Sequence, residues 1–461
     1  MTQPLSTIPT TDERWLAFAQ RTADVIAAHP HLLPIRQTIF KDFVERKVTL
    51  NRQEQLKSLA RLALKRQHSQ GDLSPVDVVF WLKSSREVVT EAVLPVQAAV
   101  QAHGLKTTLV DDTNEHIFVD TLQPAPVKFQ IAYQPFGRAK WQNAWADLQA
   151  CLPDDLLPGS YSAFQDLGFI SENCVEEAVH VLSQLKPRLL VVLVDQLLSD
   201  SAACVAARRL GIPSLVLLHG AVSPYNAPLT ADRMGVWGQV SKEQMIDLGV
   251  PADQLVILGS PRHDQFAGAA PAGVKQQFCD LLGLDDLPLL VFFSNGNDPR
   301  RNSYEAVQGC ADWLEQAAAQ LTGQMAFAVR LHPNEDGSFY KNCPHLRVFK
   351  QECDLATTLA AADICGALCS TTLIDSLLYR KPVLQFYADG WPHLADNWQR
   401  GLAQRISSAA ELTQTLALGL EHHGWEMLAA EQYALVGTVF AHHGHAVQAA
   451  ADYIAGQVQS I

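Results

Sequence analysis

The sequence predicts an α/β protein built from two doubly wound units in series, each a parallel sheet covered by helices on both faces. Short apolar runs alternate with helix-like stretches along most of the chain, a pattern typical of parallel strands buried on both faces. The alternation stops near residue 268, where the small-residue stretch 267–273 resembles a linker, and it then starts again. The length of 461 residues suits two large domains or about three smaller ones.

The first half of the chain is expected to hold an N-terminal helical segment, residues 1–75, and a first Rossmann-like unit, residues 76–267, on the acceptor side. Apolar residues recur at helical spacing in the segment, at Trp15 and Phe18 and again at Leu56 and Leu59. A helix-like stretch over 86–103 ends at Gly104, as a C-cap would. The predicted strands of this unit are 77–82, 107–110, 189–194, 213–218, 234–237 and 255–258.

The second half is expected to hold a second Rossmann-like unit, residues 274–408, followed by C-terminal helices over 409–461. Leu412, Leu416 and Leu420 are spaced by four residues, which indicates a helix. The predicted strands of this unit are 289–293, 327–331, 346–349, 363–365 and 383–386.

Composition argues against several classes of function. The chain has 35 Lys and Arg against 48 Asp and Glu, a net charge of -13, and no basic run for nucleic acid or anionic lipid. The polar N-terminus lacks the features of a signal peptide, and no apolar stretch is long enough to span a membrane. Nine cysteines without a CxxC pair indicate reduced thiols and therefore a cytoplasmic protein. Peripheral association with an assembly complex at the inner face of the inner membrane is compatible with this expectation.

Ligands of doubly wound sheets bind at the carboxyl ends of the strands, so the residues that follow each strand are the candidate site. In the first unit Asp195 follows 189–194 and His219 follows 213–218, where Gly220 permits a tight turn. Asp232 stands just before 234–237, behind the loop that starts at His219. Both aspartates could instead be caps of a helix or a strand.

Residues that follow two further strands of the first unit belong to the same edge. Ser260 and Arg262 lie in the Gly-Ser-Pro turn after the last strand and are expected at an interdomain face. Asp111 and Asp112 end the second strand, where they could touch an acceptor, although capping is the better interpretation.

The second unit offers a candidate phosphate site. Asn295 and Gly296 follow the first strand in a small polar loop, whose backbone N–H groups could face a phosphate or only form a turn. Arg330 and His332 end the next strand, and Pro333 fixes the imidazole at the strand tip.

The strongest part of this site is the start of a helix. Ser370, Thr371 and Thr372 follow a strand and open an amphipathic stretch. Hydroxyl groups and free N–H groups at the positive end of a helix form an anion site, although plain N-capping would use the same residues. Together with His332, the pattern favours phosphate binding.

The motifs Arg330–Pro333, Cys369–Thr372 and Tyr379–Val383 resemble the C-terminal unit of GT-B bacterial surface-polysaccharide glycosyltransferases. The relatives are the capsule and lipopolysaccharide Kdo transferases, the bacterial sialyl- and polysialyltransferases and the CDP-glycerol glycerophosphotransferases. The resemblance extends over about residues 185–390. It implies two Rossmann-like domains that face each other across a cleft, with His332 and the Ser-Thr-Thr motif on the donor phosphate.

The first unit carries a broader resemblance. The stretch from His219 to Arg262 is shared with the same enzymes and is also similar to the non-hydrolysing UDP-GlcNAc 2-epimerases. The epimerase signature, with a glutamate and an arginine at fixed places, is missing from 221–233, and the acidic chain lacks the basic membrane-docking segments of the glycerophosphotransferases. These departures favour a CMP-sugar donor, such as CMP-Kdo or another CMP-ulosonate.

The resemblance therefore implies a metal-independent glycosyltransferase that moves a sugar from a nucleotide donor onto a glycan or lipid-linked glycan in lipopolysaccharide or capsule synthesis, without a cofactor. Arg330 and His332 would stabilise the leaving phosphate, and His219 would face the cleft. Asp232, or second Asp195, would act as general base, or as nucleophile if configuration is retained. The alternatives are a sugar-nucleotide epimerase or hydrolase, a CDP-glycerol glycerophosphotransferase-like enzyme, and an inactive binding module.

One histidine-rich region lies outside this scheme. His422, His423, His442, His443 and His445 occur in the C-terminal tail. They are interpreted as solvated helix surface, so the sequence predicts no metal site.

Overall fold

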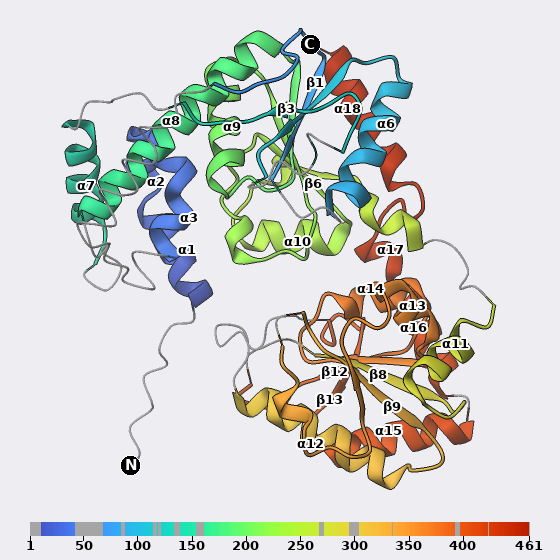
Figure 1. Ribbon diagram of the computed structural model, residues 1–461. Helices are drawn as coiled ribbons and strands as arrows, with labels where there is room; N and C mark the ends of the chain where they lie inside the picture. Colours follow the sequence, from blue (N-terminus) through green and yellow to red (C-terminus); the bar gives the residue numbers. More distant parts are fainter. Residues whose placement is uncertain are drawn as a thin grey trace, which may run out of the picture. The chain divides into compact units, whose positions relative to one another are not determined.

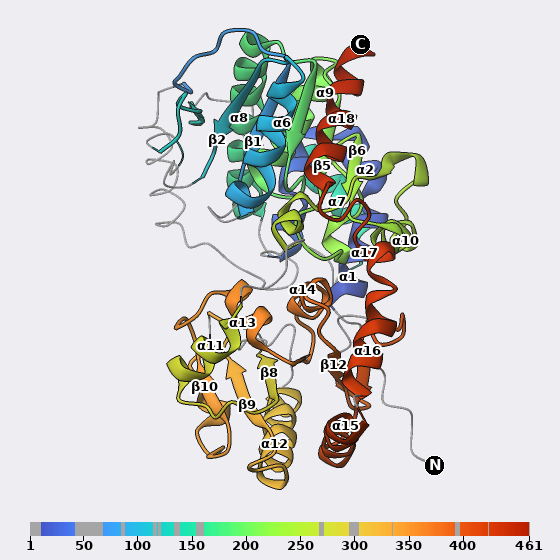
Figure 2. The same ribbon diagram turned by 90° about the vertical axis from the view of Figure 1, so that its right-hand side faces the viewer.

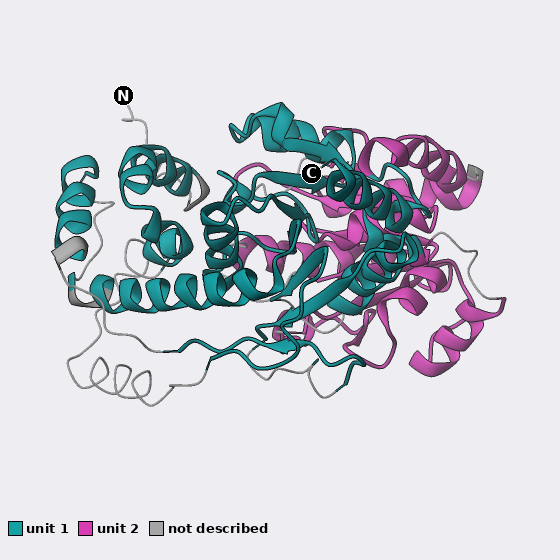
Figure 3. Cartoon of the chain, turned by 90° about the horizontal axis from the view of Figure 1, so that it is seen from above, with its two compact units in different colours: residues 1–264, 440–461 teal, residues 265–439 magenta. Residues whose placement is uncertain are grey.

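The computed structural model describes residues 11–41, 68–83, 88–113, 118, 121–132, 139–153, 161–266, 272–294, 304–333, 335–391, 397–422 and 424–460. The chain forms two compact units, coloured separately in Figure 3. Unit 1 comprises Met1–Asp264 together with Phe440–Ile461, and unit 2 comprises Gln265–Val439.

Unit 1 is built on a seven-stranded sheet in the order β3-β2-β1-β4-β5-β6-β7, with neighbouring strands parallel (Figure 1). Its central strands are continuous buried apolar runs, which is why the sequence predicted them so well. The strand β3 was not predicted, because two residues at a sheet edge carry no pattern. The strands are β1 Val78–Leu82, β2 Thr107–Asp111, β3 Val127–Lys128, β4 Leu189–Val192, β5 Ser214–Leu217, β6 Arg233–Val236 and β7 Leu255–Ile257.

Helices cover both faces of this sheet. On one face α6 and α18 lie side by side and bury the apolar side chains of β1 and β4 (Figures 1 and 2). On the other face α8 packs against α9, which contacts β1, β4 and β5. The helical segments are η3 Val89–Val93 (a π-helix), α6 Leu94–Ala102, α8 Tyr161–Leu185, α9 Leu198–Arg209, η5 Pro224–Asn226, α10 Gln239–Asp247, η6 Ala252–Gln254, η7 Pro261–Phe266 and α18 Ala446–Gln459.

The N-terminal helices form a lobe of unit 1 with its α7. Trp15, Phe18 and Phe40 pack with Trp141 and Phe164 in one fully buried aromatic cluster. The predicted helical segment is thus present up to residue 41, and its Leu56, Leu59, Leu62 and Leu64 lie outside the described residues. The elements are α1 Thr11–Arg21, α2 Ala23–Ala28, η1 Pro30–Ile35, α3 Arg36–Thr38 and α7 Ala139–Cys151.

Unit 2 repeats the architecture with a six-stranded parallel sheet in the order β10-β9-β8-β11-β12-β13. The last strand, β13, was not predicted because its three residues include two polar side chains. The strands are β8 Leu289–Phe293, β9 Ala326–Arg330, β10 Arg347–Phe349, β11 Ile364–Ala367, β12 Val383–Phe386 and β13 Gln404–Ile406. The helices are α11 Val274–Leu282, α12 Tyr304–Gln320, η8 Ser338–Tyr340, α13 Leu355–Ala361, α14 Thr372–Leu378, α15 Ala409–His422, α16 Gly424–Tyr433 and α17 Val436–Val439.

The C-terminal helices do not form a segment of their own. Leu412 and Leu416 of α15 are buried in the core of unit 2, whereas Ile454 and Val458 of α18 are buried in the core of unit 1. Each helix follows the sheet that buries its apolar face, so the predicted segment 409–461 is divided between the two units.

Three smaller expectations concern thiols and membranes. The cysteines are unpaired, as expected of reduced thiols, and Cys204 and Cys365 are buried, while Cys369 is half-buried. Among the helices that the structure describes, none is both long and apolar enough to cross a membrane.

The crossing of the C-terminal chain over a turn of unit 1 gives a first prediction. Gly259 has a φ of +78°, and a Cβ there would lie 2.3 Å from the carbonyl oxygen of Ala441. We expect Gly259→Ala to lower the free energy of unfolding by more than the ~1–2 kcal/mol of a left-handed alanine, because backbone must also move. Gly249→Ala is the matched control, since its φ is +89° and nothing lies within 4 Å of the position that a Cβ would take. Urea unfolding measures both, and equal losses would mean that the crossing imposes no constraint.

Candidate functional site

The carboxyl edge of the unit 1 sheet collects five polar residues that are far apart in the sequence. Lys83 follows β1, Asp112 follows β2, Asp195 lies three residues after β4, His219 two residues after β5, and Arg262 shortly after β7. The strand order reverses between β1 and β4, so the topological switch point of this sheet lies there. Open α/β sheets bind ligands at such points, which makes this edge the candidate site of unit 1.

The imidazole of His219 is held in one tautomer. Its Nδ1 lies 3.0 Å from the carbonyl oxygen of Leu193, and because a carbonyl only accepts, Nδ1 carries the proton. Burial lowers the pKa of His219, and the positive charge of Arg262 lowers it further. The ring is therefore neutral at pH 7, with the lone pair on Nε2 and no hydrogen bond to that atom from the described part of the chain. A half-buried neutral imidazole of this kind can accept a proton from a substrate.

The turn after β7 supports this histidine. The Arg262 Nε donates to Glu91 of η3 over 2.8 Å, which keeps the guanidinium at this edge. Ser260 was expected at an interdomain face, but it is buried, and its hydroxyl lies 2.6 Å from Nδ1 of the buried His263. Ser260 therefore fixes the turn, and Arg262 is the residue of the pair that is partly exposed.

Asp195 is a structural carboxylate. It is buried and accepts the backbone N–H groups of Thr230 at 2.6 Å and Ala231 at 3.0 Å, and the side-chain amide of Gln196 at 3.1 Å. Burial raises its pKa, against the opposing effect of these hydrogen bonds. The prediction of Asp195 as a base is corrected: its oxygens anchor the loop that connects β5 to β6.

The N-terminal lobe holds the same loop from the other side. The buried Arg36 donates to Gln196 at 2.9 Å and to the carbonyl of Pro228 at 2.7 Å, and desolvation lowers its pKa to about 10. Trp15 donates to the carbonyls of Pro224 at 2.9 Å and Ala227 at 3.1 Å. The N-terminal helices thus position the segment that leaves His219, a role that the sequence did not suggest.

Asp232 lies at the opposite edge of the sheet. Its Oδ2 accepts from the backbone N–H of Ser214 at 2.9 Å and from the hydroxyl of Ser214 at 2.8 Å, and Ser214 is the first residue of β5. A residue just before a strand of a parallel sheet lies at the amino edge, whereas His219 lies at the carboxyl edge. The expectation that Asp232 faces the same ligand as His219 is therefore wrong, and Asp232 links the starts of β5 and β6.

The switch point itself holds a charge cluster that is partly buried. Lys83 donates to the carbonyl of Asp112 at 2.7 Å and lies 3.3 Å from its carboxylate. Asp200, in the first turn of α9, is fully buried, and neither of its carboxylate oxygens has a hydrogen-bond partner in the part of the chain described. Burial, and then the charge of Asp112, raise the pKa of Asp200 well above its usual value. Asp200 was missed in the sequence because it lies inside a helical stretch.

The neighbouring Asp111 has the capping role that the sequence favoured. Its carboxylate accepts from the backbone N–H and hydroxyl of Thr113, at 2.9 and 2.6 Å, and from the N–H of Phe118 at 2.9 Å. Asp111 thus shapes the turn after β2, and Asp112 is the residue that contacts Lys83 at the switch point.

In unit 2 the carboxyl edge is organised around Ser294, which follows β8. Its hydroxyl accepts the backbone N–H of His332 at 2.8 Å and donates to the carboxylate of Glu335. Glu335 is buried, and its second oxygen has no hydrogen-bond partner among the described residues. This network fixes the strand tip that carries His332, whose side chain is exposed. Ser294 and Glu335 were not predicted, because their contact joins residues 41 positions apart.

Arg330 turns toward α13. Its guanidinium donates to the hydroxyl of Thr358 at 2.6 Å, and Asp354 is the nearest acid that favours its charge. Partial burial is the main cause that lowers the pKa of Arg330. The predicted contact of Arg330 with a phosphate remains a prediction.

The Ser-Thr-Thr motif begins α14 as predicted. The Ser370 hydroxyl lies 3.0 Å from that of Thr372 and accepts the Thr372 N–H at 3.2 Å, while Thr371 is exposed. The helix has only seven residues and carries the buried Asp375 in its first turn. These hydroxyls are available to a phosphate, but this short helix adds little dipole to their effect. Asn295 and Gly296 lie outside the described residues.

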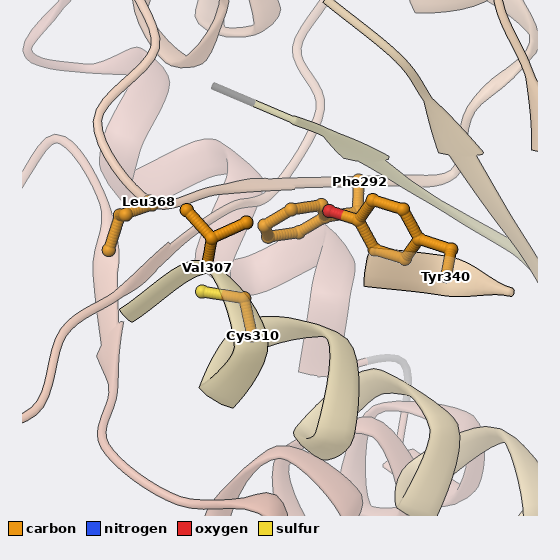
Figure 4. Close-up of a pocket in the computed structure, with 5 residues that line it drawn as sticks. All are labelled: Phe292, Val307, Cys310, Tyr340 and Leu368. Atoms are coloured by element: carbon orange, nitrogen blue, oxygen red, sulfur yellow. The ribbon is translucent and has the colours of Figure 1, made fainter. Parts of the chain in front are cut away.

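A small cavity beneath this edge is not the nucleotide site. Phe292, Val307, Cys310, Tyr340 and Leu368 line it, and their side chains converge on it in Figure 4. Its volume of about 10 Å³ is that of one water molecule, and the buried Tyr340 hydroxyl has no partner within the described residues.

The sequence matches no protein-family model and no curated protein. The structure is similar to a UDP-GlcNAc 2-epimerase from Neisseria meningitidis bound to UDP-GlcNAc, with a TM-score of 0.52 and 13% identity over 82% of this chain and 99% of that chain. It is also similar to Anabaena HepE in complex with UDP, with a TM-score of 0.53 and 13% identity over 84% and 100%. A glycosyltransferase from Rickettsia africae gives a TM-score of 0.53 and 10% identity over 84% and 100%.

These similarities establish the fold. The chain has the two-domain Rossmann-like GT-B fold that the sequence predicted, with seven and six parallel strands where six and five were predicted. At 10–13% identity the comparisons extend to the fold alone, and they do not single out the Kdo transferases or sialyltransferases named in the resemblance.

The orphan carboxyl group of Asp200 gives a prediction for stability. Its folded-state pKa lies above the ordinary value of 3.8, so between these two pH values the folded state binds more protons than the unfolded state. The free energy of unfolding therefore falls as pH rises through that window, by up to about 1.4 kcal/mol per pH unit. We expect Asp200→Asn, which cannot ionise, to exceed the wild type in melting temperature at pH 8 and to lose this advantage near pH 4.

The exposed Asp253 provides the control. We expect Asp253→Asn to follow the wild-type melting curve at every pH. If Asp200→Asn did the same, Asp200 would ionise normally and would not be a buried neutral acid.

Proposed function

We propose that the protein is a sugar-nucleotide enzyme that transfers a sugar to an acceptor hydroxyl group, with His219 as the general base. The observation that carries this proposal is the state of the imidazole: Nδ1–H is held by Leu193, the pKa is lowered, and Nε2 is open. The carboxylates near it are engaged, Asp195 by the loop N–H groups and Glu91 by Arg262. His219 is thus the group best prepared at this edge to accept a proton.

The chemistry follows from the parts. The Nε2 of His219 removes the proton of the acceptor hydroxyl as its oxygen bonds to the anomeric carbon, while the bond from that carbon to the donor phosphate breaks. The electron pair of that bond leaves with the nucleotide. The hydroxyls of Ser370 and Thr372, and the exposed His332, are proposed to hold the phosphate and stabilise its added charge.

In this proposal the donor is a nucleotide sugar. The identity of its nucleobase is a separate question. The motifs Arg330–Pro333 and Cys369–Thr372 resemble those of enzymes with CMP-sugar donors, with Kdo or another ulosonic acid as the sugar. The similar structures hold uridine nucleotides. If the donor is a CMP-sugar, the proposed acceptor is a glycan or lipid-linked glycan of lipopolysaccharide or capsule synthesis.

Epimerisation of a sugar nucleotide is the second candidate function. It is favoured by the likeness to UDP-GlcNAc 2-epimerases. The absence of the epimerase signature from 221–233 argues against it. Product analysis separates the two, because an epimerase converts its sugar nucleotide without an acceptor, whereas a transferase releases free nucleotide and needs the acceptor glycan.

The role of His219 can be tested by His219→Gln. The variant loses the basic nitrogen and keeps a side chain of similar polarity, so we expect transfer to fall by about 10²–10⁴-fold, as for other lost general bases. Because the pKa of His219 is lowered, the acidic limb of the wild-type pH–rate profile is expected below pH 6.5 and is expected to vanish in the variant. Initial rates over a pH series measure both effects.

Asp232→Asn is the matched control, since Asp232 lies at the other edge of the sheet and bonds only to structural groups there. It is expected to keep the wild-type rate and to lose ~1–3 kcal/mol of stability. A rate that falls with Asp232→Asn and not with His219→Gln would overturn the proposal.

Nucleotide choice can be tested by thermal shift. A ligand that binds only the folded state raises the melting temperature, and on the resemblance of the phosphate motifs we expect CMP or CDP to raise it more than UDP or GDP at equal concentration. His332→Ala is expected to reduce the shift without lowering the melting temperature of the free protein, because the side chain is exposed. A larger shift with UDP would assign the site to the nucleotides of the similar structures and would leave the proposed base untouched.

A further inference from the structure

Unit 1 contains a cluster of two histidines and a glutamate that the sequence analysis did not detect. His68 precedes β1, and Glu177 and His180 belong to α8. Each residue offers one ligand atom, and the three atoms lie within 4.8 Å of one another. The imidazole rings are 4.7 Å apart between centroids, with an interplanar angle of 35°.

The position of each side chain is fixed by its neighbours. Glu177 and His180 are three residues apart on a helix and so share one face of α8. The Glu177 carboxylate is buried, accepts the backbone N–H of Ser69 at 2.7 Å through Oε1, and lies 2.7 Å from Nδ1 of His68 through Oε2. The Gln184 amide lies 3.0 Å from Nε2 of His180, one turn further along the helix.

We propose that His68, Glu177 and His180 bind a divalent transition-metal cation, with zinc as the preferred ion. The inference is independent of the proposed transferase activity. The cation would replace the proton that His68 and Glu177 now share, and the opening of this contact is feasible because the side chain of His68 is 51% exposed.

The donor set selects the ion. Two imidazole nitrogens and one carboxylate oxygen suit Zn²⁺, with ligand distances of about 2.0–2.2 Å, and they suit Mg²⁺ or Ca²⁺ poorly, because those ions prefer oxygen. Tetrahedral ligands at such distances lie about 3.3–3.5 Å apart, so the 2.7 Å contact must widen slightly and the others, at up to 4.8 Å, must close. The exposed side of His68 leaves room for water as a fourth ligand.

The surroundings provide the outer shell that metal sites need. Ser69 N–H orients the carboxylate, and the Gln184 amide, turned to present its oxygen, can accept the N–H of His180 while the other ring nitrogen binds the ion. With neutral imidazoles the site carries one negative charge, and the protein as a whole carries a net charge of -13, which favours a cation.

Binding would fasten the chain before β1 to α8. Gln70 pairs with Lys128 as an antiparallel bridge at the β3 edge, and the N–H of Val76 donates to the carbonyl of Leu185 at the end of α8. The site therefore acts on the segment that enters the sheet, at a place distinct from His219 at the carboxyl edge. A structural role of the ion follows from this position.

The test is a cobalt and zinc titration of the full-length protein after removal of metal with a chelator. We expect one tight equivalent of Zn²⁺, a rise in melting temperature on binding, and Co²⁺ absorption bands typical of tetrahedral nitrogen and oxygen ligands without thiolate charge transfer. His180→Ala is expected to weaken binding by more than about tenfold, since even an outer-shell partner is worth about 10–100-fold. Its half-buried position on a helix lets alanine preserve the fold.

Two control variants separate this site from surface binding. His345 lies 2.6 Å from Glu315, and this pair resembles the proposed site but has one histidine in place of two. We therefore expect His345→Ala to bind zinc as the wild type does. Glu177→Gln is expected to abolish tight binding, whereas Glu176→Gln, at the exposed neighbouring position, is expected to retain it. Absence of a tight equivalent in the wild type, equal affinity in His180→Ala, or thiolate bands from cysteine would overturn the proposal.

Discussion

The parallel direction of the strands is the constraint on which the candidate site depends. In both sheets the neighbouring named strands run the same way, so the residues that follow strands meet at one edge and those that precede strands meet at the other. This separates His219 from Asp232 although they are only 13 positions apart in the numbering. It also gathers Lys83, Asp112 and Asp200 at the switch point of unit 1.

A second constraint is the cost of burying charge. Asp195 and Arg36 are almost completely buried, and hydrogen bonds offset much of that cost, although the Nε of Arg36 has no partner within the described residues. Together with Gln196 they hold the loop that follows His219, so the N-terminal lobe and the sheet stabilise one segment of the site from two sides. Asp200 differs, since neither oxygen of its carboxyl group has a partner within the described chain and burial raises its pKa well above the usual value.

The carboxyl edges of the two sheets carry different groups. At the edge of unit 1 the open group is a neutral imidazole, a proton acceptor. At the edge of unit 2 His332 and Thr371 are exposed, and Ser370 and Thr372 are half-buried. The histidine and glutamate cluster on α8 stands apart from both edges.

The sequence by itself determined the fold class, most strands and the positions that follow them. Buried parallel strands appear in a sequence as continuous apolar runs, such as Val78–Leu82 and Leu289–Phe293. It missed β3 and β13, whose two or three residues carry no such pattern. Only the tertiary structure decided which candidates are held in structural contacts. Whether Asp195 binds loop N–H groups, whether Ser294 meets Glu335, and whether His68 reaches Glu177 depend on contacts between residues 35 to 109 positions apart. Such contacts are set by how whole elements pack, and no local pattern of residues records them.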